Sequence, residues 1–135
     1  MTTVATFGTF DLFHFGHLRL LERAQTYGDR LVVGVSSDAL NEAKKGYLPV
    51  FSERDRLAIV GALGIVDEVF LEESLEAKRD YLLDAGADVL VMGDDWRGAF
   101  DHLSHIVKVT YLPRTNGIST SDLKRVITLG EGEPL

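Results

Sequence analysis

Short apolar runs alternate with amphipathic stretches along the chain, and this alternation limits the possible folds more than any other feature. Helical patterns of about 10–12 residues separate most of the runs, an arrangement typical of βαβ units and a parallel sheet. The runs lack regular polar–apolar alternation, as expected where helices cover both faces of a sheet. The expected fold is therefore α/β: a single-domain, doubly wound, Rossmann-like, mostly parallel five-stranded sheet with helices on both faces. The five expected strands are residues 3–7, 30–36, 68–71, 89–92 and 106–112.

Local signals set the expected helix boundaries. Leu18, Leu21 and Ala24 share one face of a helical pattern that ends at Gly28. Serine and threonine before an apolar pattern are typical N-caps. The other expected boundaries are Ser52 and Ser74 as N-caps, Gly86 as the stop of the helix that Ser74 begins, Ser119 or Thr120 as the last N-cap, and a loop over residues 44–49.

The composition narrows the class of protein. The chain has 135 residues, of which 45% are hydrophobic, enough for one ordinary core and too many for a disordered chain. There is no cysteine, which excludes disulfides, thiolate metal sites and a cysteine nucleophile. No apolar run approaches the ~20 residues of a membrane-spanning helix, and Met1–Val4 have no basic segment, so we expect neither a membrane partner nor a secretory signal. The 14 basic and 21 acidic residues give a net charge of −7, which argues against nucleic acid as a partner. We expect one catalytic domain over residues 1–130 and a flexible tail over 131–135.

The segment Gly8–His17, with the sequence GTFDLFHFGH, joins the first expected strand to the first expected helix. A helix N-terminus presents unpaired N–H groups and partial positive charge, so it attracts phosphate. His14 and His17 are three residues apart, and both imidazoles point to one side if the helix has already begun. Gly16 has no side chain and would let a phosphate approach the backbone. The segment therefore predicts two histidine donors that stabilise charge developing on a phosphoryl group.

The same histidine spacing also fits other functions. A lone histidine is more often a surface or capping residue, and a His-x-x-His pair can hold a metal ion. Catalytic zinc normally takes three protein ligands, and the His-Glu-x-x-His pattern is absent. A metal-dependent hydrolase using His14, His17 and Asp11 is therefore a weaker alternative. His102 and His105 have the same spacing without a glycine-rich lead-in, and we expect both on the surface of a short helix.

A second candidate segment, Arg114–Ser121, lies between the last expected strand and the last expected helix and has the sequence RTNGISTS. It places a guanidinium, a glycine and several hydroxyls before a helix N-terminus, which are the components of a phosphate cradle. Taken alone, these serines and threonines are better explained as N-caps. Their position after a strand of the same sheet as the histidine pair favours phosphate binding.

Two further groups of polar residues have two explanations each. The segment Gly93–Trp96 follows a buried strand, and Asp94 and Asp95 could hold Mg²⁺, a ribose or an amino group, or form a polar turn beside an aromatic plug. Clustered basic residues suggest an anion site, although a solvated helix surface explains at least half of them equally well. They are Lys44, Lys45, Arg54, Arg56, Lys78 and Arg79.

Together these segments resemble the cytidylyltransferase branch of the nucleotidyltransferase superfamily with the His-x-Gly-His signature. The resemblance extends from Val4 to about Ile127, and the GDDW and RTxGIST segments make it more specific than His-x-Gly-His alone, which adenylyltransferases share. It implies transfer from CTP to sn-glycerol 3-phosphate, giving CDP-glycerol and pyrophosphate by direct in-line attack at the α-phosphorus, with Mg²⁺ as cofactor. It also implies a cytoplasmic homodimer.

The resemblance implies a role for each candidate residue. His14 and His17 would contact the nucleotide phosphates and the transition state, and Arg114 would contact the leaving β and γ phosphates. Lys44 or Lys45 would hold phosphate, and the length of this loop leaves the choice between them open. The implied nucleotide-binding residues are Thr9, Phe10, Asp11, Gly16, Asp94, Asp95, Thr115, Gly117, Ile118, Ser119 and Thr120.

On the acceptor side, the resemblance implies that Lys78 faces the acceptor phosphate and that Arg56 lies near the active site. Asp11 would belong to the acidic set around the nucleotide and Mg²⁺. ATP in place of CTP, another phosphorylated alcohol or sugar as acceptor, and a regulatory domain that binds nucleotide without turnover remain alternatives. Three positions depart from the family pattern: Gly64, Leu75 and Asn116.

Overall fold

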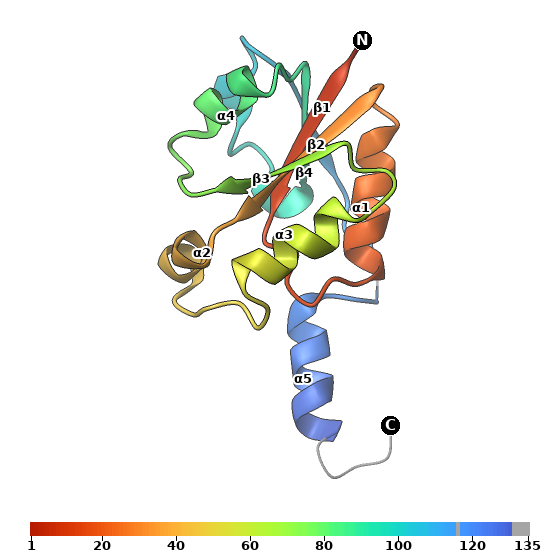
Figure 1. The fold of residues 1–135 in the computed structure, drawn as a ribbon, viewed down its shortest axis with the longest axis vertical. Helices are drawn as coiled ribbons and strands as arrows, with labels where there is room; N and C mark the ends of the chain where they lie inside the picture. The colour runs from red at the N-terminus through yellow and green to blue at the C-terminus, as the bar shows by residue number, and fades with distance from the viewer. Residues whose placement is uncertain (116, 131–135) are drawn as a thin grey trace.

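A five-stranded parallel sheet forms the centre of the molecule in the computed structural model, which describes residues 1–115 and 117–130 (Figure 1). The strand order is β3-β2-β1-β4-β5, and every neighbouring pair is parallel. The doubly wound α/β fold predicted from the sequence is confirmed. The strands are β1 (Thr3–Gly8), β2 (Arg30–Ser36), β3 (Glu68–Glu72), β4 (Val89–Gly93) and β5 (Lys108–Leu112).

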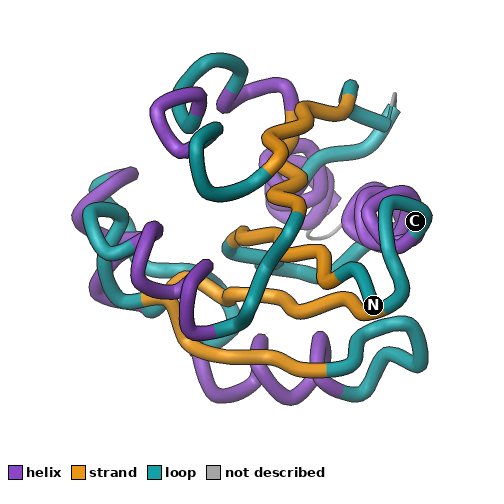
Figure 2. Tube along the Cα trace, turned by 90° about the horizontal axis from the view of Figure 1, so that it is seen from above, coloured by secondary structure: helices purple, strands orange, loops and turns teal. Residues whose placement is uncertain are grey.

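Successive residues of the central strand β1 point into two separate cores. Val4 packs into the core that α1 (Phe15–Gln25) and α3 (Glu53–Gly61) cover. Ala5 and Phe7 pack into the core on the opposite face, which is covered by α4 (Lys78–Asp84) and the short 3-10 helices η1 (Asp94–Trp96) and η2 (Asp101–Leu103). Figure 2 shows helices on both sides of the strands. Because both faces of the strands are buried, their sequences read as continuous apolar runs.

The helix α2 (Asp38–Lys45) occupies part of the segment that we expected to be a loop. It begins directly after β2, where the Ser37 hydroxyl accepts a hydrogen bond from the backbone N–H of Leu40 at 3.0 Å. It ends at Gly46, whose φ of 81° belongs to the left-handed region that glycine adopts without strain. The prediction of a loop at Lys44 and Lys45 was wrong: both lysines lie in the last turn of α2, whose sequence reads as polar because Leu40 is its one large apolar residue.

The serine N-caps were predicted with mixed success. The hydroxyls of Ser52 and Ser119 accept from the backbone N–H groups of Asp55 (3.2 Å) and Asp122 (3.1 Å), which confirms both caps. The hydroxyl of Ser74 accepts from the backbone N–H of Ala77, but α4 begins only after Ala77. Ser74 is therefore not the N-cap of α4. Two other elements are shorter than predicted. The helix α1 ends at Gln25. The strand β5 begins at Lys108, because the backbone N–H groups of the two residues before it donate to the carbonyl of Leu103.

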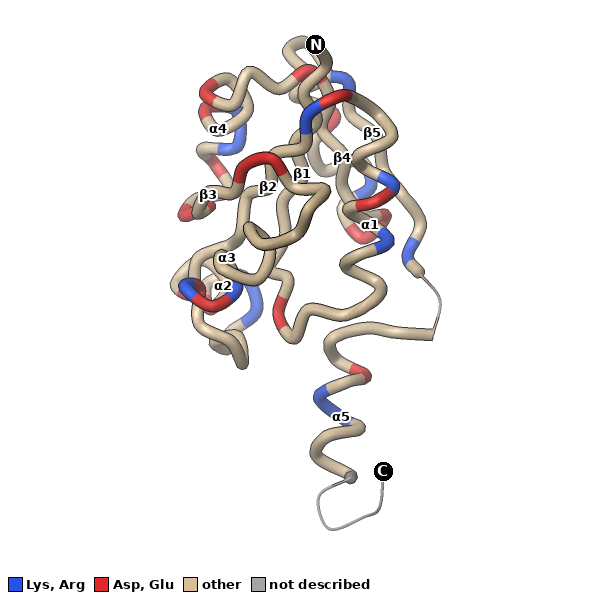
Figure 3. The backbone as a smooth tube through the Cα atoms, turned by 45° about the vertical axis from the view of Figure 1, so that its right-hand side comes forward, with Lys and Arg blue, Asp and Glu red and all other residues tan. Residues whose placement is uncertain are grey.

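The last helix, α5 (Thr120–Gly130), runs from the edge of the sheet away from the body of the molecule (Figure 1). The tail predicted over residues 131–135 lies outside the described residues. Within residues 1–115 and 117–130, no helix combines the length and the apolar character needed to cross a bilayer. Basic and acidic residues are interspersed along the chain rather than gathered on one side (Figure 3).

Candidate active site

The carboxyl ends of all five strands open into one cavity of about 610 Å³. The strand order changes direction between β1 and β4, and the crevice outside such a point is where open α/β sheets bind ligands. The cavity lining includes the last residue of every strand: Gly8, Ser36, Glu72, Gly93 and Leu112. Residues that are far apart in the sequence therefore meet in one place.

The two histidines form the N-terminal cap of α1. Nδ1 of His14 accepts from the backbone N–H of Gly16 at 3.0 Å, and Nδ1 of His17 accepts from the backbone N–H of His14 at 3.2 Å. The two rings are stacked, with centroids 3.7 Å apart. Because each Nδ1 accepts a hydrogen bond, each neutral ring carries its proton on Nε2. The arrangement therefore provides two Nε2–H donors on one wall of the cavity.

Gly16 has a different role from the one predicted. Its backbone N–H already donates to the His14 ring, and a Cβ at this position would lie 2.8 Å from that ring. The glycine therefore makes room for His14 to fold back over the start of α1, rather than leaving its N–H open to a phosphate.

Burial keeps the two imidazoles uncharged. It lowers the pKa of His14. Burial and then the neighbouring charge of His14 lower the pKa of His17 to about 3, against the opposing effect of Asp11. Two positive rings stacked at this distance would also repel each other. At neutral pH the pair can therefore serve as two neutral hydrogen-bond donors.

The loop between β1 and α1 is held in a strained conformation. Phe10 has a φ of 55° and Leu12 a φ of 51°, values that bulky residues seldom adopt. The guanidinium of Arg56 donates to the carbonyl of Thr9 at 2.9 Å, and the ring of Phe10 packs edge-on against His17. Such strain persists only where surrounding contacts fix the backbone, and it is common in binding sites.

Asp11 fixes this loop and does not point toward a metal site. Its carboxylate accepts from the backbone N–H groups of Val50 (2.7 Å), Phe51 (2.9 Å) and Leu12 (3.1 Å), and the residue is 5% exposed. Lys124 lies 3.7 Å from the same carboxylate. Among the described residues, no group of three histidine, aspartate or glutamate side chains could hold a metal ion. The structure therefore assigns Asp11 to positioning the loop.

The segment before α5 forms a second wall of the cavity. The residues predicted there that line the cavity are Arg114, Thr115, Ile118, Ser119 and Thr120. The Thr120 hydroxyl donates to the carbonyl of Asp11 at 2.9 Å. This hydrogen bond links the start of α5 to the loop between β1 and α1, residues 9–14, which we call the histidine loop. Gly117 does not line the cavity, but its φ of 85° makes it the residue that can turn the chain there. Asn116 lies outside the described residues.

Lysines from α2 and α4 form the opposite wall. Lys44 donates to the hydroxyl of Ser36 at 3.2 Å, whereas Lys45 is exposed at the rim. Lys78 is 3% exposed and forms an ion pair with Glu72. All three lysines line the cavity, so the structure brings together the predicted phosphate-binding and acceptor-binding cations.

Arg56 does not reach the cavity, contrary to its predicted position on the acceptor side. It is completely buried, and its guanidinium donates to the carbonyls of Thr9, Ser36 and Phe51 and to the carboxylate of Asp38. Arg56 therefore joins three chain segments beneath the cavity floor.

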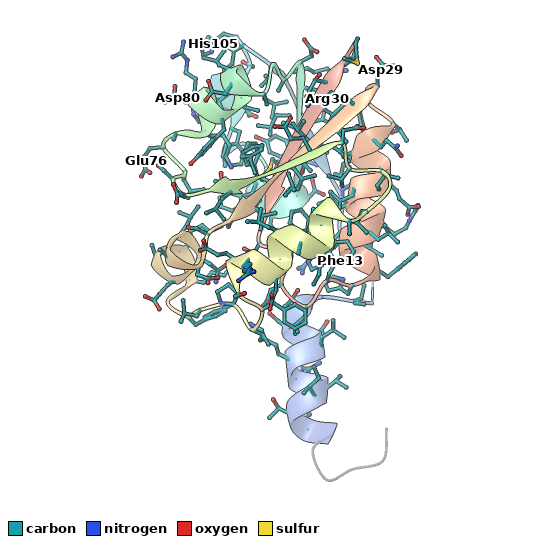
Figure 4. The ribbon with its side chains drawn as sticks, viewed as in Figure 1. Phe13, Asp29, Arg30, Glu76, Asp80 and His105 are labelled. Carbon is teal, nitrogen blue, oxygen red and sulfur yellow. The ribbon has the colours of Figure 1, made fainter. Side chains whose placement is uncertain are left out.

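Several other predicted residues also lie away from the cavity. Asp94 forms an ion pair with Arg97 outside the cavity, whereas Asp95 lines it. Gly64 precedes β3 at the opposite end of the sheet, so only Leu75 of the two described departures from the family pattern borders the site. The residues that do not line the cavity also include Arg54 and Arg79, both exposed, and His102 and His105, exposed around η2 (Figure 4 labels His105).

Sequence patterns missed several residues that line the cavity. Ser36 and Glu72 are polar, buried and the last residues of their strands, and polarity at the end of an apolar run is a signal that could have revealed them. Lys124 is four residues after Thr120, a spacing that places both on one face of α5. The other polar residues missed are Arg23, Asn41 and Tyr47.

Comparisons with known proteins show the family of the chain. The sequence matches the cytidylyltransferase-like family over residues 5–126. It is 48% identical to glycerol-3-phosphate cytidylyltransferase of Bacillus subtilis (strain 168) over 129 residues, 94% of this chain and 98% of that protein. The protein of the same name from Staphylococcus aureus (strain NCTC 8325 / PS 47) is 41% identical over 127 residues, 93% of this chain and 94% of that protein.

A solved structure shows the same arrangement of strands and helices. The lipopolysaccharide core biosynthesis protein of Thermoplasma volcanium GSS1 is 27% identical, with a TM-score of 0.74, and the match covers 86% of this chain and 99% of that chain. The family match spans most of the sequence, and the two named relatives are matched over nearly their full length. The chain therefore belongs to the cytidylyltransferase-like family and is a nucleotidyltransferase.

Proposed function

We propose that this enzyme transfers the cytidylyl group of CTP to sn-glycerol 3-phosphate, giving CDP-glycerol and pyrophosphate. The observation that carries the proposal is a single cavity whose walls are suited to phosphate. The His14 and His17 donors and the N-terminus of α5 face this cavity, and so do Lys44 and Lys78. The names of the two glycerol-3-phosphate cytidylyltransferases that resemble the chain supply the substrates.

The reaction requires no covalent intermediate with the enzyme. A phosphate oxygen of the acceptor attacks the α-phosphorus of CTP and forms a new P–O bond, while the bond from the α-phosphorus to the bridging β-phosphate oxygen breaks. Pyrophosphate takes the electron pair of that bond. Catalysis then depends on positioning two anionic substrates and stabilising the charge of the transition state.

On the nucleotide wall, the two Nε2–H groups donate to oxygens of the α-phosphate. Neutral imidazoles suit this role, because they stabilise developing charge without transferring a proton. Arg114, Ser119 and Thr120 lie where the leaving β and γ phosphates would meet the N-terminus of α5. On the other wall, Lys78 and Lys44 would receive the acceptor phosphate.

Mg²⁺ enters this proposal as part of the substrate. Mg²⁺ usually keeps several waters and is bound by substrate phosphates with one or two carboxylates. Asp11 and Asp95 are the predicted carboxylates that line the cavity. Of the two, Asp95 is the one whose carboxylate has no hydrogen bond or ion pair with the described residues. We expect chelation of Mg²⁺ to abolish turnover and to leave the melting temperature of the nucleotide-free protein unchanged.

The proposal extends to a homodimer that acts in the cytoplasm, where CTP is available. Val126, Ile127 and Leu129 on the projecting helix α5 are between 51% and 68% exposed. Apolar residues that gather on a surface commonly mark a contact with another chain. Sedimentation of wild-type protein and of Ile127→Glu tests this, because the substitution should shift a dimer to monomers.

The experiment that tests the reaction is pyrophosphate release with Mg²⁺, crossing CTP, ATP, GTP and UTP with sn-glycerol 3-phosphate and other phosphorylated alcohols and sugars. We expect release only with CTP and sn-glycerol 3-phosphate, and CDP-glycerol as the product. The matched variants are His14→Ala, which should lose turnover, and His105→Ala, which alters an exposed histidine and should not. Pyrophosphate release with a different pair would show that the proposed substrates are wrong. Binding of CTP without any pyrophosphate release would indicate a regulatory domain.

A further inference from the structure

Glu72 connects the two lysines that face the acceptor side of the cavity. It is 1% exposed, and its carboxylate forms an ion pair with the ammonium of Lys78. Its other oxygen accepts from the hydroxyl of Ser36 at 3.3 Å, and that hydroxyl accepts from the ammonium of Lys44 at 3.2 Å. The result is a continuous polar chain from α2 through the ends of β2 and β3 to α4.

The position of Glu72 follows from the local structure. It is the last residue of β3, and strand geometry puts its side chain on the same face as Phe70, which belongs to the core beneath α4. Lys78 is the first residue of α4, and it shares the buried face of that helix with Leu82. The carboxylate and the ammonium are therefore brought together by the packing of α4 on the sheet.

Two aromatic rings face the buried ammonium of Lys78, and Glu72 forms its ion pair among the described residues. The ammonium lies 3.7 Å from the ring centroid of Phe7 and 5.0 Å from that of Phe100. Burial lowers the pKa of Lys78, and the charge and hydrogen bond of Glu72 oppose that effect. Burial also lowers the pKa of Lys44, and the charge of Glu72 opposes that effect.

The lysines retain binding capacity after these contacts. An ammonium has three N–H donors, and among the described side chains each of these ammonium groups donates to one oxygen, Lys78 to Glu72 and Lys44 to Ser36. Two lysines and one carboxylate leave one positive charge on the cluster. The remaining donors and this charge are what an acceptor phosphate would bind.

We infer that Glu72 is a positioning residue that holds Lys44 and Lys78 in place and charged, so that they bind the phosphate of the acceptor. The inference deepens the proposed function and rests on it for the identity of the acceptor. Glu72 is 1% exposed and its two oxygens already have partners, Lys78 and Ser36, so it acts through the lysines and does not need to touch the substrate.

The pH dependence depends on every charged group that faces the two lysines. Glu72 and Lys44 face Lys78, and the groups that face Lys44 are Glu72, Lys45, Lys78 and Arg56. Glu72 is the acid in this set, so its removal lowers the pKa of both lysines further. The lysines then lose their protons at a lower pH, and acceptor binding fails earlier as the pH rises.

The test is Glu72→Gln, which keeps the shape of the side chain and removes its charge. We expect the KM for sn-glycerol 3-phosphate to rise roughly tenfold or more, the effect of losing a charged hydrogen-bond partner, with a smaller change in the KM for CTP. The alkaline limb of kcat/KM for the acceptor should move toward neutral pH. Glu76→Gln is the matched control, because Glu76 is exposed on the surface (Figure 4) and should change neither quantity.

A second variant separates charge from position. Glu72→Asp keeps the charge but shortens the side chain by one methylene, so the KM for the acceptor should rise while the alkaline limb stays where it is. This variant carries the test if Glu72→Gln does not fold. Unchanged acceptor KM and pH profile in Glu72→Gln, or equal losses for CTP and acceptor with no shift of the limb, would overturn the inference.

Failure of the proposed function gives a different result. In that case wild-type protein makes no CDP-glycerol, whatever residue stands at position 72. The inference about Glu72 fails only where the wild-type enzyme is active and the variants do not separate the two substrates.

Discussion

Arg56 and Lys78 are both buried cations near the carboxyl ends of the strands, yet they use their N–H donors differently. Arg56 directs its guanidinium to three backbone carbonyls and to Asp38. Lys78 has one oxygen partner among the described residues, Glu72, and two aromatic neighbours. Arg56 lies outside the cavity lining, whereas Lys78 is part of it.

The difference shows how to separate a structural cation from a binding one. Burial and an acidic partner are common to both residues and therefore do not distinguish them. The useful question is how many donors remain after the contacts within the protein have been counted. A guanidinium satisfied by carbonyls holds chain segments together, and an ammonium with unused donors facing a cavity can bind an anion.

Arg56→Met gives the largest expected effect on stability. It leaves the Asp38 carboxylate without its cation and three carbonyls without their donor. Each buried acceptor left without a donor typically costs about 1–3 kcal/mol, so we expect a loss of about 3 kcal/mol or more of folding free energy. Urea denaturation should show this loss, whereas Arg54→Met, an exposed residue two positions earlier, should change little. Equal stability of the two variants would contradict the structural role of Arg56.

The double variant Glu72→Gln with Lys78→Met should affect catalysis more than folding. Replacing both members of a buried pair by neutral residues is often neutral for stability or stabilising. We expect kcat/KM for the acceptor to fall on the order of 100-fold, or about 2.7 kcal/mol. Steady-state kinetics and urea denaturation of the same preparation measure both quantities. A variant as unstable as Arg56→Met would remove the distinction between the two cations.

Asp38→Asn should have a smaller effect than Arg56→Met. The side chain of Asp38 is 32% exposed, so water screens its charge and can replace part of its contact with Arg56. The carbonyls of Thr9, Ser36 and Phe51 would still hold the guanidinium. We expect a loss of about 1 kcal/mol, measured by urea denaturation. A loss as large as that of Arg56→Met would show that the carboxylate, not the carbonyls, fixes the arginine.

The smallest expected effect concerns His17, whose side chain is half-buried. The pKa of His17 is lowered to about 3 in the folded protein, from a value of 6.5 in the unfolded chain. Between these two pH values, the unfolded chain binds a proton at this histidine that the folded protein does not bind. Stability therefore falls as the pH decreases through this range, by less than about 1 kcal/mol between about pH 7 and about pH 6. Urea midpoints at the two pH values test this, and His17→Asn should reduce the difference. A wild-type protein that gains stability on acidification would contradict the pKa shift.

Features carried by adjacent residues were predictable from the sequence. The apolar runs of the strands, the caps at Ser52 and Ser119, and the segments that hold His14 and Arg114 are each local, and the structure places them as expected. The family resemblance reached the same segments because their residues are contiguous.

Features that depend on contacts between distant segments were not predictable. Asp11 is an acid in a phosphate-binding motif. Only the fold shows that its carboxylate already accepts hydrogen bonds from the backbone N–H groups of Val50 and Phe51. Arg56 has the residue type of a substrate ligand, and only the fold shows that carbonyls from three segments surround it. Glu72 belongs to no motif, since its partners come from other elements.

The strand order also sets the sequence in which the site is completed during synthesis. The central strand β1 is made before the other four strands, and its pairing with β2 and that of β2 with β3 do not require any residue after Glu72. The other edge of β1 has no partner until β4 emerges at Val89, and unpaired edges of this kind attract other chains. The histidine loop is therefore made before the other walls of the cavity, and it is enclosed only after β5 and α5 have emerged.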